Sequence, residues 1–306
     1  MFKHLVLSGG AHLGIAELGA LLYLEEKDLF NNTDIEIYDG TSIGAIFSVL
    51  FSLGSSAKDL VDYFVNRPWE QVIQESIPSL SIDTMSSILD SGGILDSNFI
   101  MNTLKPFLLV HFDKARQDKI EYITLNDLYE YTHKKVYLYT VEMNTDNDIK
   151  LVSLSHETHP ELSLLKAIQM SCALPLIFKP IIYNDCYYID GGILSNYPLQ
   201  QAIERNKDNK DEILAIHLRG REETLKKSKH FLLDFHLSLL NRMINHLRVH
   251  YEVTKKEIPY EMVIMTDQFN TSDMISCLRS REARERLSQQ GRESAIVFCQ
   301  YTDLFR

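Results

Sequence analysis

The sequence predicts an α/β fold in which helices cover a central, mostly parallel β-sheet. Three observations indicate this class: β-rich and helical segments alternate over residues 1–55, small residues form tight turns between them, and β-rich runs return later in the chain. Parallel strands need long crossover connections, which such an alternation supplies. The chain has 306 residues, which is enough for one large domain of this class.

The elements can be placed along the chain from their composition and periodicity. We expect strands at residues 1–7 and 35–39, each followed by a helix, at 16–29 and 45–51. Asp96 is placed as the N-cap of a helix through Leu104, which Pro106 limits because proline has no N–H to donate. The later elements are strands at 135–141, 149–154, 186–189 and 213–218, and a helix at 164–172.

The organisation of the chain favours a single unit. No repeat, low-complexity tract or clear linker divides it, so we predict one domain over residues 1–306 with a helical C-terminal region over about 221–306. Hydrophobic residues make up 45% and charged residues 24% of the chain, as is typical of a soluble protein with a large core. No apolar run approaches the roughly 20 residues of a membrane-spanning helix, and the N-terminus is too short in apolar residues for a secretory signal.

Charge and cysteine content exclude several functions. The net charge of −11 disfavours nucleic acid as a partner. The four cysteines are widely spaced and form no C-x-x-C pair, which argues against a zinc site and a disulfide framework. They favour a reducing, cytoplasmic location. Neither a P-loop nor a G-x-G-x-x-G pattern is present, which argues against phosphate and dinucleotide binding. We expect no metal and no cofactor. Nothing in the sequence fixes the oligomeric state.

Ser42 is the first candidate catalytic residue. It occupies the centre of a G-x-S-x-G pentapeptide, between an expected strand and an apolar helix. A serine on such a strand-to-helix turn exposes its hydroxyl above the sheet. Gly40 and Gly44 would let the chain make the turn and let a substrate approach the backbone.

The loop after the first strand is a candidate oxyanion hole. Backbone N–H groups of Gly9, Gly10 and Ala11 would converge where a helix begins, and the helix dipole favours negative charge there. The alternative interpretation is a tight βα turn that merely requires small residues.

Asp190 is the candidate base, because it ends an expected strand and is followed by Gly191 and Gly192. Active-site groups gather at strand ends in open α/β folds. The alternative is an ordinary Asp-Gly turn with a solvated carboxylate.

Taken together in this order, the three motifs resemble the patatin-like phospholipase family. The segment at 167–180 (AIQMSCALPLIFKP) is similar to the family's A-x-x-A-S-x-A-x-P-x-x-F-x-P, and residues 190–198 (DGGILSNYP) are similar to its D-G-G-x-x-x-N-x-P. The likeness covers roughly residues 4–220. It implies a three-layer α/β/α fold and a serine acyl hydrolase that cleaves fatty-acyl esters of phospholipids or related lipids.

The resemblance also implies a Ser/Asp dyad. Ser42 would attack the ester carbonyl and form an acyl-enzyme, and Asp190 would serve as general base. Asn196 would support the site. The family's loop G-G-G-x-K/R-G is altered here, because Ala11 replaces the third glycine and Leu13 the basic residue. His12, beside Leu13, is expected to point elsewhere.

Two other functions remain open from the sequence. His217 follows Asp190 on a predicted strand and would complete a Ser/His/Asp esterase. The change at Leu13 could instead mark a weakly active or inactive protein that binds a lipid or a partner on the same fold.

Residues 226–256 form a candidate membrane-binding helix. From Arg219 to Lys256 the sequence has nine Lys and Arg against four Asp and Glu. A basic amphipathic helix can lie on an anionic membrane, and core packing or a partner interface is the alternative. Two adjoining apolar stripes occur at helical spacing: Leu232, Phe235, Leu239, Met243 and Leu247, and Leu233, Leu237, Leu240 and Ile244.

Overall fold

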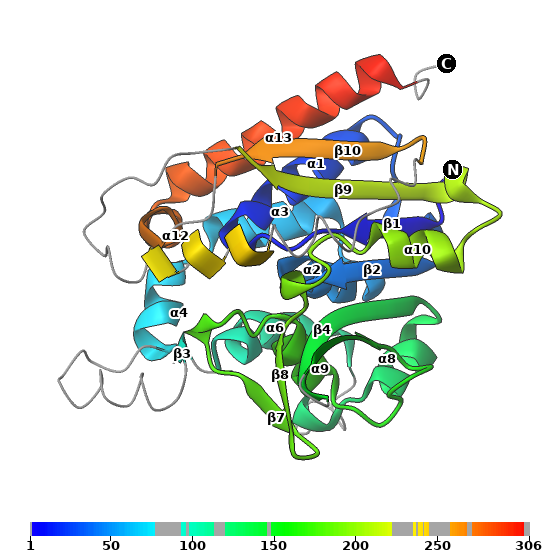
Figure 1. The fold of residues 1–306 in the computed structure, drawn as a ribbon. Coiled ribbons are helices and arrows are strands. Elements are labelled where there is room, and N and C mark those ends of the chain that lie inside the picture. The colour runs from blue at the N-terminus through cyan, green and yellow to red at the C-terminus, as the bar shows by residue number, and fades with distance from the viewer. Residues whose placement is uncertain are drawn as a thin grey trace.

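The structure is a computed structural model, which describes residues 2–76, 93–95, 98–112, 120–145, 148–221, 235–236, 238–240, 242–244, 258–267 and 271–302. Within these ranges, eight strands form one sheet in the order β10-β9-β1-β2-β4-β8-β7, and β5 also pairs with β4 (Figure 1). Their bounds are β1 His4–Leu7, β2 Ile37–Thr41, β4 Lys135–Thr145, β5 Asp148–Leu154, β7 Ile181–Tyr183, β8 Cys186–Asp190, β9 Ile213–Gly220 and β10 Glu261–Thr266. Two short strands, β3 (Gly93–Leu95) and β6 (Leu176–Phe178), pair separately.

The sheet is parallel in its larger part. Strands β10, β9, β1, β2 and β4 run in the same direction, whereas β5 and β8 are antiparallel to β4, and β7 to β8. The predicted α/β fold with a mostly parallel sheet is confirmed. Strand β10 lies in the C-terminal region that was expected to be helical, and it extends the sheet beyond β9.

Helices lie on both faces of this sheet (Figure 1). On one face, α1 and α2 pack over β1 and β2 in the main apolar core, while on the other α10 packs against Val6 and Ala215 in a smaller core. No helix in the described ranges has the length and apolarity needed to cross a membrane. The helices are α1 Ile15–Glu26, α2 Ile43–Ser52, α3 Ala57–Asn66, α4 Trp69–Ser76, α6 Asn98–His111, α8 Leu125–Thr132, α9 Leu164–Ser171, α10 Leu199–Arg205, α12 Thr271–Arg279 and α13 Arg281–Tyr301.

Helix α13 crosses α1 at two glycines. A Cβ atom at Gly19 would lie 1.9 Å from the Ser288 carbonyl oxygen, and one at Gly291 would lie 1.7 Å from that of Ala16. Only glycine permits such an approach of two backbones. The C-terminal helix is therefore part of the main core, although it lies beyond the likeness at residues 4–220.

Pro106 does not limit helix α6, contrary to the sequence prediction. The helix continues to His111 with the proline inside it. A proline leaves the carbonyl four residues earlier without its helical donor, and here Arg67 Nη2 donates to that Asn102 oxygen at 2.8 Å. A side chain from a distant segment thus replaces the missing N–H. The predicted N-cap, Asp96, lies outside the described residues.

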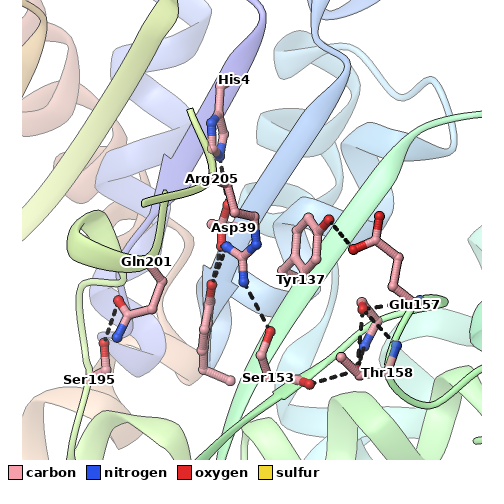
Figure 2. A network of polar contacts seen from close by, with 11 residues as sticks. His4, Asp39, Tyr137, Ser153, Glu157, Thr158, Ser195, Gln201 and Arg205 are labelled. Atoms are coloured by element: carbon pink, nitrogen blue, oxygen red, sulfur yellow. Dashed lines mark hydrogen bonds and ion pairs between the residues drawn. The ribbon is translucent and has the colours of Figure 1, made fainter. Parts of the chain in front are cut away.

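A buried polar network fixes α10 to the sheet (Figure 2). Asp39 on β2 is fully buried, and its carboxylate accepts from His4 Nε2 at 2.6 Å, from Arg205 Nη1 at 2.5 Å, and from the Tyr139 hydroxyl. The Arg205 guanidinium also lies over the Tyr137 ring, 3.6 Å from its centroid. Since Arg205 ends α10, the network sets the position of the segment that follows Asp190.

Candidate active site

The pairing of β4 explains why Ser42 and Asp190 meet although they are far apart in the sequence. Thr41, the last residue of β2, pairs with Tyr139, and Asp190, the last residue of β8, pairs with Thr140. Strand β5 pairs with the residues of β4 that pair with the end of β2 and with those that pair with β8, so β5 occupies the opposite edge of β4 from both. Strands β2 and β8 therefore share one edge of β4. They run toward each other, because β2 is parallel and β8 antiparallel to β4. Both candidate residues therefore leave the sheet at neighbouring positions.

Ser42 has the backbone geometry of a strained turn. Its φ of 56° and ψ of −121° lie outside the usual regions for a residue with a Cβ. A Cβ at Gly40 would lie 2.3 Å from the Gly44 carbonyl oxygen, and one at Gly44 would lie 2.5 Å from that of Leu7. Neither glycine position has room for a side chain, so the pentapeptide is needed for the turn.

Asp190 is buried at the end of β8. Its side chain is 3% exposed, and Oδ1 accepts a hydrogen bond from the Gly192 N–H at 2.7 Å. The Cys172 thiol lies close by: it donates to the Ser42 carbonyl at 3.2 Å. Burial, and secondarily the Asp190 carboxylate, raises the pKa of that thiol well above its usual value. Cys172 is thus a neighbour of both candidate catalytic residues.

The loop at Gly9 lies close to Ser42 and to Asn196, which is beside the loop that follows Asp190. A Cβ at Gly9 would lie 3.1 Å from the Ser42 Cβ and 2.4 Å from Asn196 Oδ1. Asn196 Oδ1 would also lie 2.8 Å from a Cβ at Gly192, beside Asp190. Asn196 therefore lies between the loop after β1 and the loop after β8.

The predicted oxyanion donors are not equivalent in the structure. The Gly9 N–H donates to the Asn196 carbonyl at 2.8 Å, and Asn196 Nδ2 donates back to the Gly9 carbonyl at 2.9 Å. Gly9 therefore differs from the prediction, because its donor is already used in joining two loops. In the part of the chain that the structure describes, the N–H groups of Gly10 and Ala11 have no acceptor. Ala11 has a φ of 49°, the left-handed region that glycine adopts more easily.

The two residues after Ala11 lie in different surroundings. Leu13 is 8% exposed and packs in the main core, so a cation at this position would have to be buried. His12, which was expected to point elsewhere, lines the cavity beside Ser42. Burial lowers its pKa to about 4, so the imidazole is neutral at neutral pH and does not replace the missing charge.

Glu17 was missed by the sequence analysis, although an acid flanked by apolar residues within α1 is an available signal. It is completely buried in α1 beneath the candidate oxyanion loop. Its Oε1 accepts from the Ser8 N–H at 3.0 Å and from the Ser8 hydroxyl at 2.8 Å. Burial raises the Glu17 pKa to about 8, with the bonds from Ser8 opposing the shift. The side chain is therefore predominantly protonated at neutral pH.

This raised pKa predicts that stability falls as pH rises. An exposed glutamate loses its proton near pH 4.5 whereas folded Glu17 keeps it to about pH 8, so between these values the folded state binds more protons. The free energy of unfolding then decreases from about pH 4.5 to about pH 8. Glu17→Gln, which cannot ionise, should flatten this slope in urea unfolding series. A Glu17→Gln slope equal to that of the wild type would contradict the assignment.

An apolar cavity opens beside Ser42. Its volume is about 930 Å³ including space open to solvent. Its surface is almost entirely apolar, as an acyl chain requires. Among its wall residues are Ile46, Phe64, Trp69, Phe99, Ile100 and Phe178.

Arg284 is the charged residue of this wall, and its charge is compensated by backbone. It is 4% exposed, and its guanidinium donates to the carbonyls of Val65, Arg67, Cys277 and Leu278 at 2.7 to 3.2 Å. These carbonyls lie at the ends of α3 and α12, where the helix dipole favours a cation. Arg284 thus joins α13 to two helices that form the cavity.

His217 does not share this cavity. Its ring stacks on Tyr197, with centroids 4.3 Å apart and an interplanar angle of 9°. Among the described residues that line the cavity with Ser42, one is a histidine, and it is His12 and not His217. The geometry therefore offers no support for a triad that includes His217.

Comparisons with known proteins agree with this architecture. The chain is 29% identical over 222 residues to the probable lipid hydrolase 463L of invertebrate iridescent virus 6, covering 70% of this chain and 69% of the relative. It is 24% identical to the uncharacterized protein YqhO of Bacillus subtilis (strain 168), over 86% of this chain and 89% of that protein. The crystal structure of VipD from Legionella pneumophila shares the fold, with a TM-score of 0.54 and 16% identity. The match covers 97% of this chain and 66% of VipD.

The match to a family model gives the class of protein, a lipid acyl hydrolase. A model of the family described as patatin-like phospholipase matches residues 5–203, which is more than half of the chain. The chain belongs to the patatin-like phospholipase family.

Proposed function

We propose that this enzyme hydrolyses fatty-acyl esters of phospholipids or related lipids with Ser42 as nucleophile and Asp190 as general base. The observation that carries the proposal is the meeting of the β2 and β8 ends on β4, beside an apolar cavity. The cavity would hold the acyl chain, and the two strand ends would place Ser42 and Asp190 at the ester bond.

The reaction proceeds in two halves. Ser42 Oγ attacks the ester carbonyl carbon while Asp190 accepts the hydroxyl proton. The N–H groups of Gly10 and Ala11 stabilise the tetrahedral oxyanion. Asp190 returns the proton to the leaving alcohol, which leaves the acyl group on Ser42. Asp190 then takes a proton from water, the resulting hydroxide attacks the acyl-enzyme, and the proton returns to Ser42 as the fatty acid leaves.

Labelling by a fluorophosphonate tests the nucleophile directly. The reagent should modify Ser42 in folded protein, and peptide mass spectrometry identifies the site. Well-folded protein that is not labelled but binds liposomes would favour the alternative, a lipid-binding protein without efficient turnover.

Filling the cavity should shorten the accepted acyl chain. Ile100 is 3% exposed in the cavity wall, so Ile100→Trp should lower kcat/KM for a palmitoyl ester by about 10-fold, or ~1.4 kcal/mol. A butyryl ester should change by less than about 2-fold, because its short chain fills less of the cavity. The matched control is Ile182→Trp on β7, where the side chain is 57% exposed. An equal loss for both esters would contradict the acyl site.

A membrane contact through the 226–256 segment is also part of the proposal. Phe235, Leu239 and Met243 of the first stripe are 41%, 44% and 56% exposed, whereas Leu240 and Ile244 of the second pack against Ile189, Ile193 and Leu194 around Asp190. The remaining stripe residues lie outside the described ranges. The exposed stripe could thus meet a lipid surface near the site. The four free cysteines fit the cytoplasmic location predicted from the sequence.

Two substitutions on this stripe test the membrane contact. Leu239→Asp with Met243→Asp should reduce sedimentation with anionic vesicles by at least about 5-fold, because two charges oppose apolar burial. The control is Val297→Asp with Tyr301→Asp, an exposed pair at the same spacing on α13. Equal sedimentation of the two double variants would contradict docking at this stripe.

A further inference from the structure

The end of helix α9 contacts the nucleophile and the base through three consecutive residues. Ser171 Oγ accepts a hydrogen bond from the Ser42 N–H at 3.1 Å. The Cys172 thiol donates to the Ser42 carbonyl at 3.2 Å. The Ala173 carbonyl accepts from the Asp190 N–H at 3.0 Å. One short segment thus holds the backbone of both candidate catalytic residues.

The contacts at Ser42 bear directly on its strained conformation. The N–H and the carbonyl of a residue belong to the two peptide planes whose rotations are φ and ψ. Ser171 and Cys172 each hold one of these planes, at a φ of 56° and a ψ of −121°. A strained conformation persists only where the surroundings hold it, so the end of α9 is one source of that restraint.

The two contacts differ in strength. The Ser42 carbonyl also accepts from the Ala45 N–H at 2.9 Å, so the weak thiol donor adds little there. Among the described residues, the Ser42 N–H has Ser171 Oγ as its acceptor, and Ser171 is completely buried. Loss of this hydroxyl would leave the N–H without a partner in a turn that already stores strain.

The α9 end is itself fixed to β4. The single hydroxyl hydrogen of Thr140 is shared between the Met170 carbonyl, 3.1 Å from Oγ1, and the Ile189 carbonyl, 2.8 Å from it. Thr140 is also the residue of β4 that pairs with Asp190. The same short stretch of β4 therefore sets the position of α9 and of the base.

We infer that Ser171 is a positioning residue, which holds the Ser42 elbow in its reactive conformation while Ala173 holds Asp190 in register with it. The inference rests on the proposed function. Ser171 lies within the 167–180 segment, whose residues the proposed reaction does not use. Its hydroxyl acts through the Ser42 backbone and not on the substrate.

The test compares Ser171→Ala and Ser171→Thr with wild type in kcat, KM and the rate of fluorophosphonate labelling. Ser171→Ala should lower kcat and the labelling rate by about 10- to 100-fold, with KM changed by less than about 3-fold. Ser171→Thr keeps a hydroxyl and should recover most of the loss. The matched control is Ser163→Ala at the opposite end of α9, where the hydroxyl donates to the Glu121 carbonyl at 2.7 Å. This variant should retain wild-type kinetics.

The outcomes separate this inference from the proposed function. Wild-type kcat and labelling in Ser171→Ala, or no recovery in Ser171→Thr, would overturn the positioning role while leaving Ser42 as nucleophile. If Ser42→Ala is as active as wild type, the proposed function itself fails. Rates are normalised to the folded fraction from near-ultraviolet circular dichroism, so a partly folded Ser171→Ala still gives a result.

Discussion

Ser42→Ala and Asp190→Asn should each lower hydrolysis of a short-chain acyl ester by on the order of 10⁴-fold or more, the loss that follows removal of a nucleophile or its partner in other serine hydrolases. Ser42→Ala removes the attacking oxygen. Asp190→Asn keeps the size of the side chain and its acceptor for the Gly192 N–H, but the amide cannot take the serine proton. Both variants should unfold at nearly the wild-type temperature, because neither leaves a cavity.

Two matched controls make this result specific. Ser52→Ala changes a serine at the other end of α2, and Asp185→Asn changes an aspartate in the turn between β7 and β8. Both should retain activity. His217→Ala should also retain it, since the ring stacks on Tyr197 away from the cavity. Activity in purified Ser42→Ala would contradict the Ser/Asp dyad. Loss of activity in folded His217→Ala would favour the triad esterase.

Asp39→Asn should destabilise the folded protein by about 3 kcal/mol or more, the cost of removing one partner from a buried ion pair. The substitution leaves the charged Arg205 guanidinium beside a neutral amide, and the Arg205 side chain is only 24% exposed to solvent. His4, which is fully buried, loses its anionic partner in the same step. Urea unfolding of the wild type and of Asp39→Asn measures the difference in the free energy of unfolding.

A double substitution distinguishes the buried charge from simple packing. Asp39→Leu with Arg205→Met removes both charges, and it should be more stable than Asp39→Leu alone because no guanidinium is left unpaired. Lys3→Gln is the surface control: its pair with Glu36 is exposed, so this substitution should leave the stability nearly unchanged. A loss below about 1 kcal/mol in Asp39→Asn would contradict the structural role of the network.

The sequence alone was sufficient for four of the five parallel strands of the main sheet and for the order of the candidate motifs. Strands β1, β2, β4 and β9 and helices α1, α2 and α9 lie where apolar periodicity and turn residues predict them. These elements are specified by short-range patterns that each segment carries by itself. Strand β10 was missed, because it is only six residues long and its two exposed side chains, Val263 and Met265, are apolar, so its sequence shows no alternation.

Other features depend on contacts between distant segments, and local patterns do not contain them. Pro106 lies within a helix because Arg67 supplies the missing donor, and Gly9 differs from its predicted role because Asn196 takes its N–H. The raised pKa of Glu17 arises from burial against Ser8. The sequence by itself determined which residues could carry the chemistry of an ester hydrolase. Only the tertiary structure decided that Ser42 and Asp190 meet, because their separation depends on how β2 and β8 pair with one edge of β4.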